Sequence, residues 1–130
     1  MIWWNLTAVA VGGFAGGCLR SLCSSWLNRS DYAIPFGTLL VNLAGSFIVG
    51  VMLAVTAVGT LGAPWKALVV TGFCGGLTTF STFSADTFTL MQTNLWAALL
   101  IVLGNLAIGM LLYLLGRRLI GRRKHDADVV

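Results

Sequence analysis

The stretch Gly72-Phe73-Cys74-Gly75-Gly76-Leu77-Thr78-Thr79-Phe80-Ser81-Thr82-Phe83-Ser84 lies inside an apolar segment that runs from about Trp65 to Met91. It combines three glycines with five hydroxyl side chains. Glycine and threonine are poor helix formers, and an interrupted helix frees backbone N–H and C=O groups. Broken helices in membranes present such freed groups to ions. The stretch therefore predicts a membrane span that is interrupted from Gly72 to Gly76 and takes part in an ion path.

The rest of the chain is also too apolar for a water-soluble globule. Of its 130 residues, 58% are apolar and only 9% are charged, whereas soluble domains carry about 25% charged residues. Three further apolar segments are long enough to cross a bilayer: about Trp3 to Ser25, Pro35 to Thr56, and Leu95 to Leu115. The sequence predicts one domain over residues 1–130, an all-α membrane protein with four transmembrane helices and a broken third helix.

The positive charge of the chain is concentrated in its C-terminal tail. The net charge is +4, and five of the eight Lys and Arg residues lie between positions 117 and 124. A nucleic-acid protein would spread basic residues over a binding face, so no nucleic-acid partner is expected. The segment from about residue 117 to residue 130 is predicted to form a basic cytoplasmic tail, following the positive-inside rule. Without this tail the charges are nearly balanced, which would allow insertion in both orientations.

Polar side chains in the second span lie on one helical face. Thr38, Asn42 and Ser46 recur at i, i+4 and i+8. Such a stripe either holds helices together or lines a pathway. In the third span, Phe80 and Phe83 also share a face, and they either pack against lipid and core or turn their positive ring edges to a small anion.

Two further features of the first span have two interpretations each. Gly12 and Gly16, and Gly13 and Gly17, form small-x-x-x-small pairs, which serve either packing within the chain or association with a second copy. Arg20 lies near the end of the span, where it either attracts anions to a channel mouth or has a structural role.

Three segments together resemble a known family, the Fluc (CrcB) fluoride channels of microbial membranes. They are residues 12–20 (Gly-Gly-Phe-Ala-Gly-Gly-Cys-Leu-Arg), residues 35–42 (Pro-Phe-Gly-Thr-Leu-Leu-Val-Asn) and the block 72–84. The resemblance implies an antiparallel, dual-topology homodimer in the lipid bilayer of a bacterial-type inner membrane. Such a dimer has two pores that pass fluoride passively, exclude chloride and confer fluoride resistance.

The resemblance also implies roles for individual residues. Six side chains match the family's pore: Phe80 and Phe83 its phenylalanine box, Asn42 and Thr38 its pore-lining donors, and Ser81 and Thr82 its polar track. Asn105 sits where family members place an amide or hydroxyl near the pore. The backbone carbonyls of Gly75 and Thr78 match those that hold a structural sodium ion (Na+) at the dimer centre. The basic tail departs from a strictly dual-topology protein, because it favours one orientation.

Other functional classes fit the sequence less well. A small multidrug-type four-helix exporter needs a membrane-embedded carboxylate in its first helix, and the segment from Trp3 to Ser25 has none. A non-transporting membrane scaffold leaves the glycines and hydroxyls of the third span without a purpose. An enzyme is not expected, because no set of nucleophile, base and orienting group is visible.

Overall fold

The computed structural model describes residues 2–28, 34–57, 59 and 61–127, with side chains described as far as Ile120. Its elements are, in order, α1 (Ile2–Leu27), α2 (Phe36–Ala57), α3 (Ala63–Lys66), the π-helix η1 (Ala67–Cys74), α4 (Gly75–Leu77), α5 (Phe80–Thr93) and α6 (Leu95–Ala127). Four helical segments are long and apolar enough to cross a membrane: Ile2–Leu27, Phe36–Ala57, Ala63–Thr93 and Leu95–Ile120. The predicted all-α architecture with four membrane spans is confirmed.

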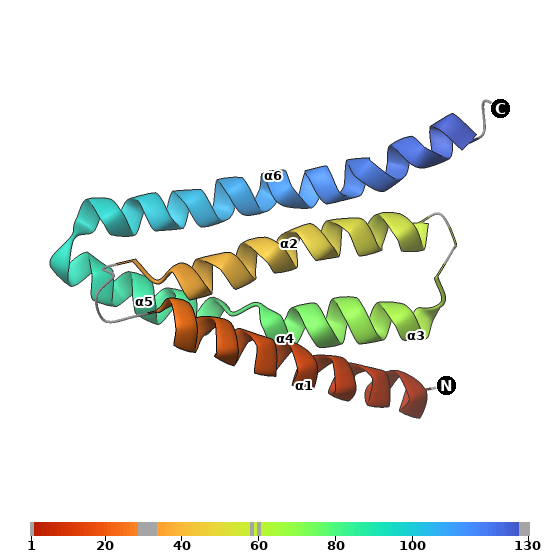
Figure 1. Cartoon of the computed structure of the whole chain (residues 1–130), viewed down its shortest axis with the longest axis horizontal. Helices are drawn as coiled ribbons and strands as arrows, with labels where there is room; N and C mark the ends of the chain where they lie inside the picture. The colour runs from red at the N-terminus through yellow and green to blue at the C-terminus, as the bar shows by residue number, and fades with distance from the viewer. Residues whose placement is uncertain (1, 29–33, 58, 60, 128–130) are drawn as a thin grey trace.

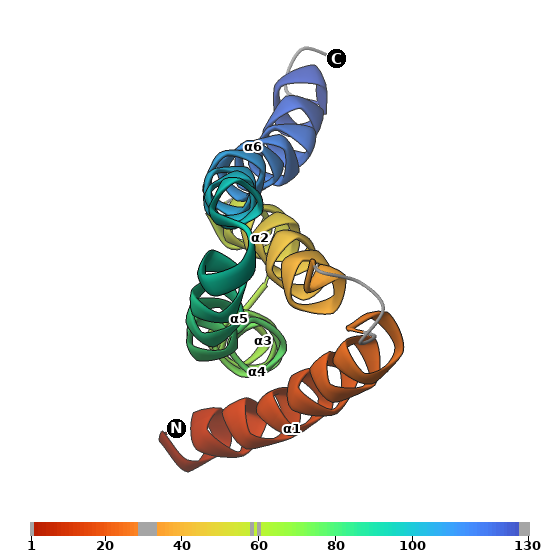
Figure 2. The ribbon, with the colours of Figure 1, turned by 90° about the vertical axis from the view of Figure 1, so that its left-hand side faces the viewer.

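The helices form an elongated bundle (Figure 1). Figure 2 shows α1 at one edge and α6 at the opposite edge, with α2 and the third span between them. Accordingly, α2 packs mainly against α6, and α1 packs mainly against η1. The two ends of the chain lie at the same end of the bundle as the connection from α2 to α3 (Figure 1). The start of α5 lies beside the first half of α2 (Figure 1), which positions the site described below.

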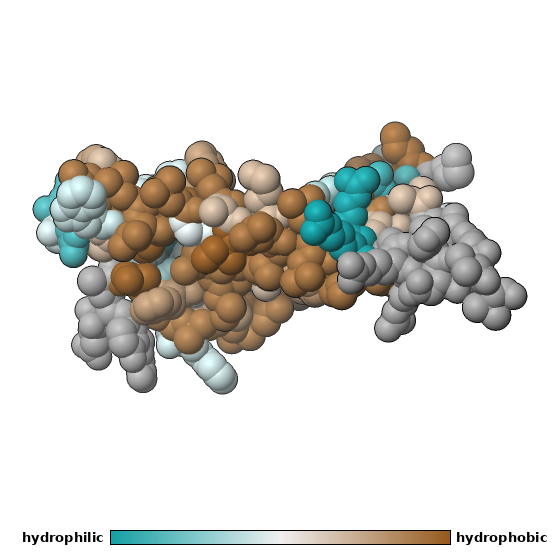
Figure 3. Space-filling view, turned by 90° about the horizontal axis from the view of Figure 1, so that it is seen from above, coloured by the Kyte–Doolittle hydropathy of each residue, from teal (hydrophilic) through white to brown (hydrophobic). Residues whose placement is uncertain are grey.

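The outer surface of the bundle is apolar, as a lipid-facing surface requires. Large side chains such as Phe14 (76% exposed) and Leu100 (71% exposed) point away from the other helices. Figure 3 shows apolar residues over the middle of one face and hydrophilic residues towards its two ends. The five tryptophans are all exposed, and they lie near the ends of the spans, where an aromatic belt is expected.

Glycines allow the helices to approach one another closely. A Cβ atom on Gly12 would meet the backbone of Leu68 and Phe73, and one on Gly16 would meet the backbone of Phe73 and Leu77. For Gly12 and Gly16, packing within the chain is therefore confirmed as the better of the two interpretations. Gly17 differs, because a Cβ atom there would meet nothing within 4 Å.

The predicted interruption from Gly72 to Gly76 is wrong in its position. Gly72 lies in η1, and Gly75 and Gly76 lie in α4, so all three glycines are helical. A Cβ atom on Gly72 would lie 3.1 Å from the Gly12 Cα, and one on Gly76 would lie 3.0 Å from the Gly13 Cα. These two glycines serve contact with α1, and the need to satisfy backbone groups in lipid outweighs their low helix propensity.

The fourth helix also continues beyond its predicted end. The sequence predicts a stop at Leu115 and Gly116, but α6 extends to Ala127. Gly116 is buried against the backbone of Phe47 and Val51 instead of ending the helix. Arg and Lys are good helix formers, so the basic segment after Gly116 prolongs the helix. Arg117 and Arg118 are exposed there.

Candidate functional site

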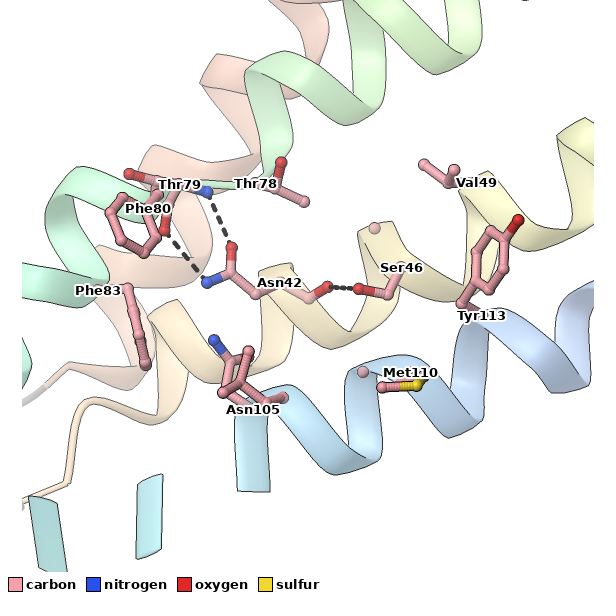
Figure 4. Close-up of a pocket in the computed structure, with 13 residues that line it drawn as sticks. Asn42, Ser46, Val49, Thr78, Thr79, Phe80, Phe83, Asn105, Met110 and Tyr113 are labelled. Carbon is pink, nitrogen blue, oxygen red and sulfur yellow. Dashed lines mark hydrogen bonds between the residues drawn. The ribbon is translucent and has the colours of Figure 1, made fainter. Parts of the chain in front are cut away.

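The third span loses its helical conformation at two residues, Thr78 and Thr79. Thr78 has φ −80° and ψ 153°, and Thr79 has φ −148° and ψ 121°, both extended. The Asn42 carboxamide of α2 pairs with the second of them: Thr79 N–H donates to Asn42 Oδ1 (2.8 Å), and Asn42 Nδ2 donates to the Thr79 carbonyl (3.2 Å; Figure 4). An amide nitrogen carries two hydrogens, so Asn42 retains one for another acceptor.

Thr79 also begins the following helix. It is buried (7% exposed), and its hydroxyl oxygen accepts from the Thr82 amide (3.2 Å) and donates to the Thr82 hydroxyl (3.1 Å). Ser81 Oγ lies 3.3 Å from the same oxygen. Thr79 is not among the site residues predicted from the sequence, although a threonine directly before a helix is a typical N-cap. The N-cap joins the two predicted polar-track residues, Ser81 and Thr82, in one hydroxyl cluster.

Several backbone carbonyls at the end of α4 lose their helical partners at this point, those of Gly75 and Thr78 among them. In an unbroken helix, the Thr79 amide would donate to the Gly75 carbonyl and the Thr82 amide to the Thr78 carbonyl. Here the Thr79 amide donates to Asn42 and the Thr82 amide donates to the Thr79 hydroxyl. The freed oxygens of Gly75 and Thr78 are the type of ligand that unwound helices offer to Na+. Among the described residues, no cluster of His, Cys, Asp or Glu side chains could hold a metal ion.

A cavity of about 560 Å³ lies beside Thr78 and Thr79, here called the extended pair, between α2, α5 and α6. Its lining includes the side chains of Asn42, Ser46, Phe80, Phe83 and Asn105. The two rings are tilted by 42°, with their centroids 6.3 Å apart. Phe83 is buried (9% exposed), whereas Phe80 is 81% exposed.

Asn105 enters the cavity from α6. Figure 4 shows its carboxamide pointing towards Asn42 and Phe83. Its side chain makes no hydrogen bond to any other residue that the structure describes. On the α2 side, the Ser46 hydroxyl donates to the Asn42 carbonyl (2.8 Å). The cavity therefore combines two carboxamides with hydrogens to donate, several hydroxyls and three aromatic rings (Phe80, Phe83 and Tyr113), without a charged side chain in its lining.

Five predicted site residues do not line this cavity: Thr38, Arg20, Ser81, Thr82 and Gly75. The buried Thr38 hydroxyl (1% exposed) donates to Asp86 Oδ2 (2.7 Å) and accepts from Asn28 Nδ2 (3.3 Å). Asn28 Oδ1 in turn accepts from the Gly37 amide at the start of α2 (2.7 Å). One network of hydrogen bonds thus joins the end of α1, the start of α2 and α5. Arg20 is half-buried on α1 and does not line the cavity.

The chain is similar to known proteins over most of its length. A family model described as CrcB-like protein, Camphor Resistance (CrcB), matches residues 7–117. This chain belongs to the CrcB family. One relative, a fluoride-specific ion channel FluC of Marinobacter nauticus, is 40% identical over 117 residues, which cover 88% of this chain and 93% of the relative. A FluC 1 channel of Yersinia pseudotuberculosis is 49% identical over 117 residues, 85% and 92% of the two chains.

The CrcB match covers most of each of the four spans and every predicted site residue. A third relative, a fluoride-specific ion channel FluC of Bordetella petrii, is 47% identical over 110 residues, 80% of this chain and 84% of the relative. The match ends at Arg117, so the rest of the basic segment lies outside it. Family membership and four apolar spans identify a multi-pass protein of a bacterial-type inner membrane, and they do not favour a small multidrug exporter.

Proposed function

We propose that this chain forms a fluoride-selective channel that lets fluoride leave the cytoplasm passively and so confers fluoride resistance. The observation that carries the proposal is the cavity beside Thr79, in which Asn42 and two phenylalanine rings face a common space. The relatives' names as fluoride-specific channels support the choice of ion. Passive transport needs neither a catalytic group nor a charged side chain in the ion path, and the lining of the cavity contains no charged side chain.

The side chains around the cavity replace the water that fluoride loses. Within the cavity, the free Asn42 Nδ2 hydrogen and the Asn105 amide donate hydrogen bonds to the ion. The hydroxyls of Ser81 and Thr82, next to the lining residue Thr79, extend this row of donors. The positive ring edges of Phe80 and Phe83 complete the shell of the ion. Chloride is larger and forms weaker hydrogen bonds, so a narrow path lined by these donors excludes it.

The residues outside the cavity have supporting roles. The Thr38 hydroxyl is committed to the Asp86 carboxylate, so Thr38 acts by holding α5 against α2 at the height of the cavity. Arg20 lies in the half of α1 that is distant from the chain's termini. There its positive charge attracts fluoride to the opposite mouth of the channel.

A second copy of the chain completes the site. Phe80 is 81% exposed in one chain although it lines the cavity, and an aromatic edge solvates an anion best where water and lipid are excluded. An antiparallel homodimer, with its copies inserted in opposite orientations, covers this ring and forms two equivalent pores. In this dimer the third span works as a broken helix whose extended pair faces the partner. The basic tail lies on the cytoplasmic side in the preferred orientation.

The freed carbonyls suit a structural sodium ion at the dimer centre. Gly75 is exposed, and a Cβ atom there would meet nothing within 4 Å, so a second copy of the chain can approach this turn closely. The Gly75 and Thr78 carbonyls from each copy would hold Na+, whose charge would tie the two broken helices together. Na+ serves the assembly here and is not transported.

The proposal is tested by fluoride efflux from liposomes. Purified protein is reconstituted into vesicles loaded with potassium fluoride, and release is followed with a fluoride electrode after valinomycin is added. We expect rapid fluoride release, and little chloride release from matched vesicles loaded with potassium chloride. Equal release of the two ions, or no fluoride release above protein-free vesicles, would refute the proposed function.

A further inference from the structure

A second cavity, of about 440 Å³, lies at the end of the bundle that carries the chain termini. It is formed by the last turns of α2 and the start of the third span, and its lining includes Leu53, Thr56 and Lys66. Among the lining residues that the structure describes, Lys66 is the only charged one. The Thr56 hydroxyl donates to the Leu53 carbonyl (3.1 Å), so the Lys66 ammonium is the main group there that can attract an ion.

The two cavities follow the same face of α2. Asn42, Ser46 and Val49 line the first cavity, and Leu53 and Thr56 line the second. Successive steps of three or four residues keep side chains on one side of a helix. Val49 and Leu53, the closest lining residues, are one turn apart, about 6 Å along the helix axis. The second cavity therefore continues the line of the first towards the end of the bundle.

The charge of Lys66 is not neutralised within the described part of the chain. Lys66 is exposed, and it forms no ion pair with any side chain that the structure describes. Asp86 is bound to Thr38, near the start of α2 and so at the opposite end of that helix. A positive group in a concave site raises the local concentration of anions, because the low-dielectric walls focus its field.

We propose that this second cavity is an anion vestibule and that Lys66 gathers small inorganic anions, fluoride among them, at the mouth on the side of the termini. The inference rests on the proposed function, since it adds an entrance to that ion path. Lys66 acts through its field and does not contact the ion in the selective region. Val49 and Leu53 are only about 6 Å apart along α2, so an anion gathered beside Lys66 is already close to the near end of the first cavity.

The test compares initial fluoride efflux for the wild type, Lys66→Arg, Lys66→Gln and Lys66→Glu at two ionic strengths. An impermeant salt such as potassium gluconate sets the ionic strength to about 20 mM or about 500 mM. The screening length is long at the lower value and short at the higher one. We expect Lys66→Gln to lower efflux by about threefold at low ionic strength, and Lys66→Glu to lower it further. Lys66→Arg should keep the wild-type rate, and the differences should disappear at high ionic strength.

Arg118→Gln is the matched control. Arg118 is an exposed cation beyond the predicted end of the fourth span, and it lines neither cavity. Its replacement should leave efflux unchanged if the charge in the vestibule is what matters. Wild-type rates for Lys66→Gln and Lys66→Glu at low ionic strength would overturn the inference. So would an equal loss at both ionic strengths, which indicates a structural role. A wild-type protein that conducts no fluoride would instead refute the proposed function.

Discussion

Replacement of Asn42 by leucine should lower fluoride efflux by about a hundredfold. Leucine has a similar volume, but it cannot pair with the Thr79 amide and carbonyl, which Asn42 holds at 2.8 Å and 3.2 Å. A buried polar group without a partner costs about 1–3 kcal/mol, so the extended pair should leave its position. The change also removes a donor from the cavity. Efflux from liposomes, normalised to the amount of reconstituted protein, measures the effect.

Gln92→Leu is the matched control for Asn42→Leu. Gln92 is exposed near the end of α5 and does not line the cavity, so loss of its carboxamide should not change efflux. If Asn42→Leu conducts fluoride as fast as Gln92→Leu does, Asn42 neither positions Thr79 nor contacts the ion, and the description of the site is wrong.

Phe83→Ile and Phe80→Ile should each slow fluoride efflux by at least about tenfold. Isoleucine retains much of the bulk but has no aromatic edge with partial positive charge. Phe83 should have the larger effect on folding as well, because it is buried in a cluster with Leu90 and Ile101. Thermal unfolding in detergent separates this loss of stability from the loss of conduction, and Phe80, which is 81% exposed in the single chain, should show mainly the latter.

Phe88→Ile is the control for the two ring variants. Phe88 lies on the same helix, is 64% exposed and lines neither cavity. Its replacement should leave efflux at the wild-type rate. If all three isoleucine variants conduct equally well, the rings of Phe80 and Phe83 only fill space, and an aromatic contribution to ion solvation is ruled out.

The four spans could be predicted from sequence because each is a long apolar segment, and lipid demands that its backbone be satisfied internally. The position of the non-helical pair could not. Low helix propensity indicated Gly72 to Gly76, but that stretch is helical, with Gly72 and Gly76 packed against α1, and the chain becomes extended at Thr78 and Thr79. Propensity is a local property, whereas the site of the extended pair depends on neighbouring helices.

Part of the candidate site could be predicted from the resemblance to the family. Asn42, Phe80, Phe83 and Asn105 do line one cavity, as the resemblance to the family implied. The pairing of Asn42 with Thr79 joins residues 37 positions apart, and no spacing rule within a helix can reveal it. Thr38 shares a helical face with Asn42, yet its hydroxyl donates to Asp86 on α5. Periodicity predicts which residues share a face, but not which partner each of them meets.

The central claim, that fluoride binds beside the Asn42 carboxamide, is tested most directly by NMR on protein labelled with ¹⁵N-asparagine. Sodium fluoride is titrated into the sample, and sodium chloride into a matched one. The side-chain amide protons of Asn42 and Asn105 should shift with fluoride and saturate, and chloride should not move them. Asn94, whose Oδ1 caps the start of α6 (3.0 Å from the Ala97 nitrogen), should not respond. Equal shifts at Asn94 and Asn42, or no shift at Asn42, would contradict the account.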